Sequence, residues 1–322
     1  MPKISKGCRM AATVSLCGLN PSRTRLIAAA LAMASGFLSA QAHALTFNVT
    51  YDSSVSSAPL GFQSAFQDAI NFYQTSFSNP ITINLNVGWG EVNGSTIGSG
   101  ALGESSSNGI GATYIQVRNA LSSVGAPGYL PASDPTGGRT IYVSTANAKA
   151  IGLGHLPPST DGYVGFNNSV NWTFDPAQRA QSGAYDFIGI AHHEISEVMG
   201  RFSTLGWNNY ESVQDLFRYT ATGALDLSGR SAYFSMDGGY TKINTFNGSS
   251  STGDLGDWAG QTVDAYNAFA SSGQELPVSA GDLKMMASLG YTAIAPVPEP
   301  SEAAFMLAGL GLLGWRYRRK AA

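Results

Sequence analysis

The chain has 322 residues, 18 of them Lys or Arg and 21 Asp or Glu, a length that suits one large domain or two small ones. Nine of the basic residues lie in the two terminal segments, so residues 45–300 carry a net charge of about −11, which argues against nucleic acid as a partner. Cys8 and Cys17 are the only cysteines, so residues 45–300 have no disulfide, no cysteine nucleophile and no cysteine-ligated zinc.

The first 44 residues have the three parts of a secretory signal peptide. Basic residues without any acidic residue come first, an apolar run follows over Leu26–Ala40, and Ala42, His43 and Ala44 form a small-x-small cleavage site. The alternative is a membrane anchor, but the apolar run is shorter than the roughly 20 residues that a spanning helix needs. We therefore expect signal peptidase to cleave after Ala44 and the protein to cross the inner membrane.

Apolar periodicity predicts a strand, a helix and a second strand at the start of the exported segment. Leu45–Asp52 and Ile81–Val92 alternate with a period of two, as strands do, and between them apolar residues recur at helical spacing from Phe62 to Tyr73. This order of elements indicates an α/β or α+β domain over residues 45–293 with a mixed, twisted sheet. The further expected elements are a Gly/Ser-rich loop over 93–112, a helix over 112–124, a strand and turn over 139–153, a strand over 162–174, a helix over 185–201 and, after short strands and tight turns, a helix over Ser279–Tyr291 that Ser279 caps.

The stretch AHHEISEVMGR, residues 191–201, carries the chemistry. His193 and Glu197 are four residues apart on the expected helix, so an imidazole and a carboxylate lie side by side and can reach one metal ion. Zinc accepts carboxylate oxygen as well as imidazole nitrogen. Glu194 lies beside them, where a general base would activate a water held by the metal. The structural alternative is an ordinary solvated helix face.

A three-ligand metal site needs one more residue, and spacing does not identify it. We favour Asp257 over His155 and Ser203, and Asp254 is a further candidate. Asp254 and Asp257 flank a glycine in a tight turn, where Asx-turn bonding or a Ca²⁺ site would also account for them. Serine is a poor zinc ligand, and His155 also suits a loop histidine with ordinary partners.

Serine hydrolase chemistry is a weaker reading of the same helix. Ser196 lies one turn from His192, but nothing in the sequence presents Ser196 on a nucleophile elbow. Tyr210 and Tyr240 are candidates for stabilising an oxyanion, without a spacing argument for either.

The motif resembles that of the metzincin zinc peptidases, H-E-x-x-H-x-x-G-x-x-H. His193, Glu194 and Gly200 are in register, whereas Glu197 and Ser203 stand where the second and third histidines would be. The resemblance implies a metzincin-like, matrixin-like fold and a substrate-binding edge strand in YVGFNNSVNWTF. It also offers Met236 as a methionine beneath the metal, although a core methionine is the favoured interpretation of Met236. APLGFQSAFQDAINFYQ, ITINLNVGWGE, HEISEVMGR, DLFRYTATG, FSMDGG and GDLGDW also resemble a group of exported, sorting-tailed proteins of metalloprotease type.

The C-terminal segment, residues 294–320, has a pattern of its own. Pro298, Glu299 and Pro300 are followed by an apolar stretch from Ala303 to Trp315 and then by four basic residues. This order resembles the PEP-CTERM sorting tail of Gram-negative bacteria, which implies recognition by an exosortase and transient anchoring in the inner membrane. The alternative is a plain C-terminal anchor. The expected destination is the cell surface or the extracellular space.

Two functions remain open from the sequence. The first is an exported zinc-dependent endopeptidase that hydrolyses a peptide or protein substrate, with His193 and Glu197 as zinc ligands and Glu194 as the base. The second is a non-catalytic cell-surface or matrix protein on a decayed peptidase fold, which binds Ca²⁺ or polysaccharide.

Overall fold

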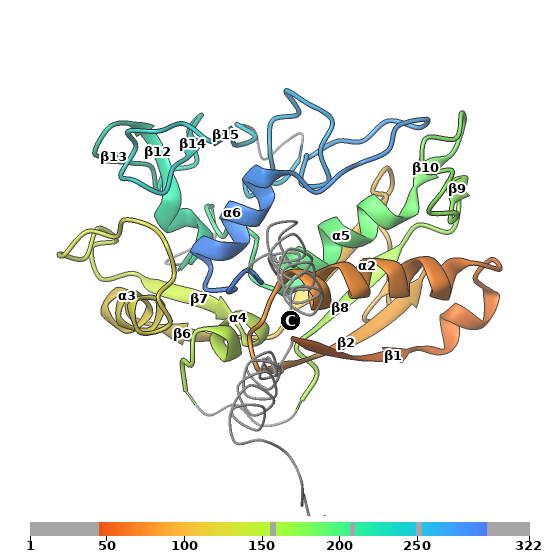
Figure 1. The fold of residues 1–322 in the computed structure, drawn as a ribbon, viewed down its shortest axis with the longest axis horizontal. Helices are drawn as coiled ribbons and strands as arrows, with labels where there is room; N and C mark the ends of the chain where they lie inside the picture. The colour runs from red at the N-terminus through yellow and green to blue at the C-terminus, as the bar shows by residue number, and fades with distance from the viewer. Residues whose placement is uncertain (1–44, 155–158, 207–209, 249–252, 295–322) are drawn as a thin grey trace, which may run out of the picture. The chain divides into compact units, whose positions relative to one another are not determined.

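The computed structural model describes residues 45–154, 159–206, 210–248 and 253–294, all within the unit His43–Ala322. These residues form a mixed α/β structure with several sheets and few helices, in agreement with the class expected from the sequence (Figure 1). The expected signal peptide with its cleavage site at Ala44, and the tail with Pro298, Glu299 and Pro300, lie outside the described residues. Within the described ranges no helix is both long and apolar enough to cross a membrane.

The central sheet has three parallel strands and one antiparallel edge strand. In spatial order the strands are β1 (Thr46–Tyr51), β2 (Thr82–Trp89), β8 (Gly162–Phe166) and β5 (Gly103–Ser107). β1, β2 and β8 are parallel, and β5 runs antiparallel to β8. In β2 the buried Ile83, Leu85 and Val87 alternate with more exposed asparagines, which confirms the period-two pattern of the sequence.

Two helices, α2 (Phe62–Ser76) and α5 (Phe187–Val198), pack against each other and against this sheet (Figure 1). Phe62 of α2, Phe166 of β8 and Phe187 of α5 meet with ring centroids 4.7–5.8 Å apart. Burying a side chain of this kind stabilises the fold by about 1.5–3 kcal/mol. The contact therefore fixes α5, which carries the sequence motif, against the middle of the sheet.

Helix α5 is shorter than the sequence predicts. Tyr185–Asp186 pairs with a neighbouring strand and does not belong to the helix. At the other end Gly200 has a φ of 111°, a left-handed conformation that glycine adopts readily and that turns the chain away from the helix axis. The motif residues from His192 to Glu197 remain within α5.

The edge strand of the sheet is β5, which corrects the sequence-based expectation. The sequence predicts that YVGFNNSVNWTF supplies the edge, but its strand β8 lies between β2 and β5. β5 belongs to the Gly/Ser-rich segment 93–112 that the sequence predicts to be a loop. Its residues GESSS have little strand propensity and no apolar alternation. Five-residue pairing with β8 and contact with α5 impose the strand conformation.

The remaining elements surround this framework. A second sheet has the order β11 (Tyr210–Ser212), β7 (Thr140–Ser144), β6 (Gly109–Ala112), and a third has the order β13 (Ala224–Leu225), β12 (Arg218–Ala221), β14 (Tyr233–Phe234), β15 (Asn244–Thr245). Two short pairs are β3 (Glu91–Val92) with β4 (Ser95–Thr96), and β9 (Trp172–Thr173) with β10 (Tyr185–Asp186). The other helices are α3 (Tyr114–Ser123), α4 (Thr145–Ala150), α6 (Ala280–Ser288), and the 3₁₀ turns η2 (Ser53–Ser57) and η3 (Gln214–Phe217).

Two helix predictions have different outcomes. The structure confirms Ser279 as the N-cap of α6: its hydroxyl accepts from the N–H of Asp282, whose carboxylate accepts from the N–H of Ser279. Residues 145–150, which the sequence predicts to be a turn, form the helix α4. Ser144 caps α4 through the N–H of Asn147, a local signal that the sequence-based reading missed.

Candidate metal centre

Helix α5 turns most of its apolar residues toward the core and three polar residues toward a cleft. Ala191 and Ile195 are fully buried in the core. His193, Glu194 and Glu197 line the cleft instead. This division follows from the 3.6-residue period of the helix.

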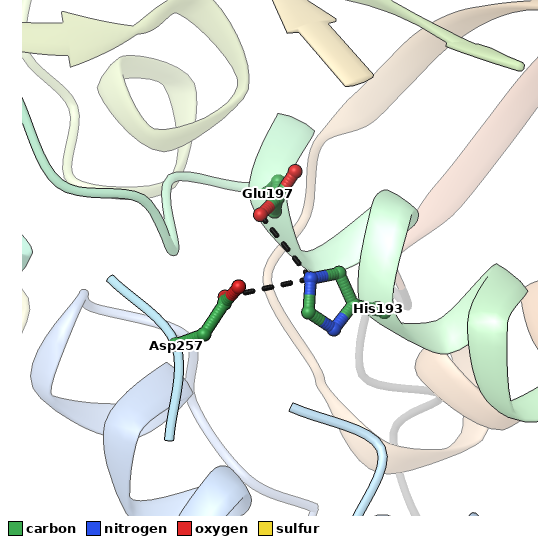
Figure 2. A group of neighbouring side chains, drawn as sticks. All are labelled: His193, Glu197 and Asp257. Atoms are coloured by element: carbon green, nitrogen blue, oxygen red, sulfur yellow. Dashed lines mark ion pairs between the residues drawn. The ribbon is translucent and has the colours of Figure 1, made fainter. Parts of the chain in front are cut away.

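His193, Glu197 and Asp257 bring three donor atoms together (Figure 2). His193 Nε2 lies 3.3 Å from Glu197 Oε1 and 3.4 Å from Asp257 Oδ1. One donor atom of each residue lies within 4.8 Å of the other two. In a tetrahedral zinc site with bonds of about 2.0–2.2 Å, neighbouring ligand atoms are roughly 3.3–3.6 Å apart. The donor types and the two distances from His193 to the carboxylates therefore fit a zinc ion.

Hydrogen bonds outside the cluster orient two of these side chains. His193 Nδ1 lies 2.8 Å from the carbonyl oxygen of Ala265, which favours a proton on Nδ1 in the neutral ring. The lone pair of the unprotonated Nε2 is then available to bind a metal ion. Ser105 Oγ, on the edge strand β5, donates to Glu197 Oε2 at 2.7 Å and leaves Oε1 toward the cluster. The sequence-based reading missed both partners, because the carbonyl leaves no side-chain signal and Ser105 lies in an expected loop.

Arg201 is a buried cation at the edge of the cluster. Its side chain is fully buried, with Nη1 2.6 Å from Asp257 Oδ1 and Nη2 3.4 Å from Glu197 Oε1. These are the same two oxygens that face His193. The guanidinium also stacks on the ring of Tyr266, 4.4 Å from its centroid, and its Nε donates to Ser196 Oγ at 2.6 Å. Arg201 therefore balances part of the negative charge of the two carboxylates.

The proximity of these groups shifts their pKa values strongly. Burial lowers the pKa of His193, but the charges of Asp257 and Glu197 outweigh burial and raise it to about 10. Burial raises the pKa of Glu197, but His193 and Arg201 outweigh this effect and lower it to about 2. Without a metal, the cluster consists of two cations and at least one fully ionised carboxylate in contact.

Glu194 lies in the same cleft under different conditions. Burial, and next the charge of Glu197, raise the pKa of Glu194 well above its ordinary value. A carboxyl group with a raised pKa is suited to exchanging protons near neutral pH. Its position depends on Gly103 of β5, where an added Cβ would lie 2.6 Å from Glu194 Oε1. Glycine is therefore required at this point of the edge strand.

The cleft has a volume of about 710 Å³ and lies between the edge strand and the loops that follow the third sheet. Its walls combine the acidic cluster with apolar groups such as Ile190 and the 61% exposed Phe269. β5 stands at the end of the strand order of its sheet, so among the described strands only β8 pairs with it. An edge strand beside a cleft can pair with an extended peptide.

The structure separates the candidates for the third ligand. Asp257 lies in the cluster, whereas Ser203 donates to Asp215 Oδ1 at 2.7 Å and ties a loop. Asp254 lines the cleft outside the three-residue group, and burial, with the charges of Glu197 and Asp257, raises its pKa to about 6. His155 lies outside the described residues.

His192 and Ser196 have structural positions. His192 is buried against Phe72 and Tyr73, and its two ring nitrogens have no partner among the described residues. Burial, and next the charge of Arg179, lower the pKa of His192 to about 3. Ser196 is fully buried and donates to the carbonyl of His193 at 2.6 Å. Neither residue is placed to act as a serine nucleophile or its base.

Three other candidates lie away from the cleft. Met236 follows β14 and packs against the core, and its carbonyl accepts from the N–H of Tyr129 at 2.7 Å. Tyr210 and Tyr240 are exposed, and Tyr210 packs edge-on against Tyr142. Met236 therefore packs against the core, in agreement with the interpretation favoured from the sequence, and the residue stacked on Arg201 is Tyr266.

Comparison with known proteins yields one finding, at the C-terminus. A family model described as the PEP-CTERM protein-sorting motif matches residues 296–320, which lie outside the described residues. No curated protein and no solved structure matches the chain. The motif indicates an exported protein whose C-terminal, membrane-associated signal is processed by an exosortase.

Proposed function

We propose that the exported chain is a zinc-dependent peptidase with a metzincin-like domain. The observation that supports this most is the convergence of His193, Glu197 and Asp257 on one point of a cleft that also contains Glu194. The antiparallel edge strand β5 beside that cleft supports peptide as the substrate class, because its free edge can bind an extended chain.

The residues would divide the work as follows. His193, Glu197 and Asp257 would hold the zinc ion, which when bound polarises a carbonyl and acidifies a water molecule in the cleft. Glu194 would accept the proton of the attacking water and pass it to the leaving amine. Arg201 and Ser105 would keep the two carboxylates oriented. The strand β5 would position the scissile bond.

Arg201 gives the non-catalytic alternative its specific support. In the metal-free site His193 and Arg201 face Glu197 and Asp257, so two potential cations meet two potential anions without any metal. A protein that kept the peptidase fold only as a surface or matrix module, binding Ca²⁺ or polysaccharide, would be stable with this ion-pair cluster.

Zinc stoichiometry separates the two functions. Elemental analysis of the purified chain after exhaustive dialysis should find about one zinc per molecule, lost in His193→Ala and in Asp257→Ala. Glu194→Gln should keep its zinc and lose hydrolysis of a peptide library. A folded wild-type chain without zinc would exclude the zinc peptidase and leave the surface module.

A further inference from the structure

The turn that carries Asp257 is fixed by buried donors from other elements. Gln214, in η3, donates its side-chain amide to the carbonyl of Gly256, and Arg218, in β12, donates Nη1 to the carbonyl of Leu255. Both side chains are fully buried. They therefore bond the two carbonyls that come immediately before Asp257 in the chain.

A third side chain that bonds this turn comes from the segment after β15. Asn247, which follows β15, donates Nδ2 to the carbonyl of Asp254 at 3.1 Å. Its backbone N–H donates to the carbonyl of Asp257 at 2.7 Å. Asn247 thus bonds both ends of the turn 254–257, and three side chains cap three successive carbonyls.

The buried charge of Arg218 has an unfavourable desolvation free energy. The described residues include no carboxylate in ion-pair contact with it; its hydrogen bonds go to the carbonyls of Leu255 and Arg230, and its guanidinium lies 4.3 Å from the ring centroid of Phe246. A buried arginine without a paired anion is rare, because desolvation of the charge is unfavourable. Gln214 adds a second such cost, since its buried Oε1 has no partner among the described residues.

The turn is closely packed at Gly256. An added Cβ on Gly256 would lie 2.8 Å from the backbone nitrogen of Ser203, so the turn touches the segment that leaves α5. The carbonyl bonds hold it there, and Asp257 Oδ1 consequently stands 3.4 Å from His193 Nε2.

We propose that Gln214, Arg218 and Asn247 are positioning residues that act through the turn 254–257 to hold Asp257 as the third zinc ligand. The inference rests on the proposed zinc site. In this proposal the third ligand is Asp257, which comes from a distant part of the chain and not from the sequence close to the motif. Residues of η3, β12 and the segment after β15 hold Asp257 at the distance that zinc requires. Partners that orient metal ligands commonly change metal affinity 10–100-fold when removed.

The test compares zinc affinity with fold stability in the full chain. Gln214→Met removes the donor to Gly256 and keeps a buried side chain of similar length. Asn79→Leu is the matched control, because Asn79 is buried and donates its amide to the carbonyl of Gly290 at 2.9 Å, far along the chain from the turn. Both variants should lower Tm by a few degrees, and only Gln214→Met should raise the zinc Kd, by about 10–100-fold in chelator competition.

A double-mutant cycle shows whether the effect passes through Asp257. In an Asp257→Asn background, Gln214→Met should no longer change the zinc Kd, because the ligand it positions is gone. Arg218→Lys, which keeps a donor for Leu255, should retain more zinc affinity than Arg218→Met. Equal Tm losses in the Gln214 and Asn79 variants with an unchanged Kd in both would overturn the positioning role. A wild-type chain that binds no zinc would overturn the zinc site itself, and this role with it.

Discussion

Zinc binding to this site should displace a proton from His193. The pKa of His193 in the metal-free protein is raised to about 10, because Asp257 and Glu197 outweigh the effect of burial. The imidazole is therefore protonated at pH 7. A histidine binds a metal only after it has lost that proton. Zinc affinity should consequently increase with pH.

The pKa gives the magnitude. At pH 7 a group with a pKa of about 10 is unprotonated in about one molecule in a thousand, so removing the proton costs about 4 kcal/mol. The apparent zinc Kd should fall about tenfold for each pH unit between 7 and 9. The same proton stabilises the metal-free fold fully below the unfolded-state pKa of 6.5, and this stabilisation is lost as the pH rises toward about 10.

Two measurements check this reasoning. Chelator competition at pH 7, 8 and 9 gives the Kd, and calorimetry in two buffers of different ionisation enthalpy gives the number of protons released per zinc. Asp257→Asn is a useful comparison, because removing one carboxylate should lower the pKa of His193 and weaken the pH dependence of what affinity remains. A Kd that does not change with pH, with no proton released, would refute the assigned charge state.

Three further predictions concern the cleft and the fold. Glu194→Gln should keep zinc and lower peptide hydrolysis by about 10²–10⁴-fold, measured as kcat/KM, if Glu194 is the base; unchanged hydrolysis would remove it from that role. Gly103→Ala should displace the Glu194 carboxyl, because the new Cβ would lie 2.6 Å from Oε1, and should lower kcat about 100-fold at unchanged zinc content; full activity would show that the strand yields. Burial and the charge of Asp264 raise the pKa of Asp282 to about 8, so the folded state keeps a proton that the unfolded chain loses near pH 4. The free energy of unfolding should therefore fall by up to about 1.4 kcal/mol per pH unit from pH 4 to 8. Asp264→Asn, which removes the neighbouring charge, should lower the pKa of Asp282, so the fall in stability should end at a lower pH in denaturant unfolding; an unaltered pH range would contradict the assignment.

Elements with strong apolar periodicity could be predicted from the sequence. β2 and α2 follow the expected pattern because half of β2 and one face of α2 must be buried, and burial selects the residues. β5 could not be predicted in this way. Its glycine and serines carry no apolar signal, and its conformation comes from pairing with β8, a partner that lies about 60 residues later in the chain.

The residues of the site that lie on α5 could be predicted from the sequence, whereas the ligand from a distant part of the chain could not. His193, Glu194 and Glu197 lie on one helix face by the geometry of the helix alone. Asp257 lies in a turn whose position depends on residues around the third sheet. The spacing of residues in the sequence therefore could not identify Asp257 among the candidate third ligands.

Arg201 explains how the buried site can contain two carboxylates, Glu197 and Asp257. Glu197 adds a negative charge to a buried site that already contains Asp257, and two unpaired buried carboxylates would repel each other and be poorly solvated. Arg201 follows the left-handed Gly200 just after α5, and its guanidinium reaches both carboxylates. With zinc bound and His193 neutral, the zinc ion, the three ligands and Arg201 together would carry a net charge of about +1, the same as a zinc ion held by two histidines and one carboxylate. Arg201 therefore compensates the charge that Glu197 adds, and the presence of Glu197 is not in itself a sign that the site cannot hold a metal.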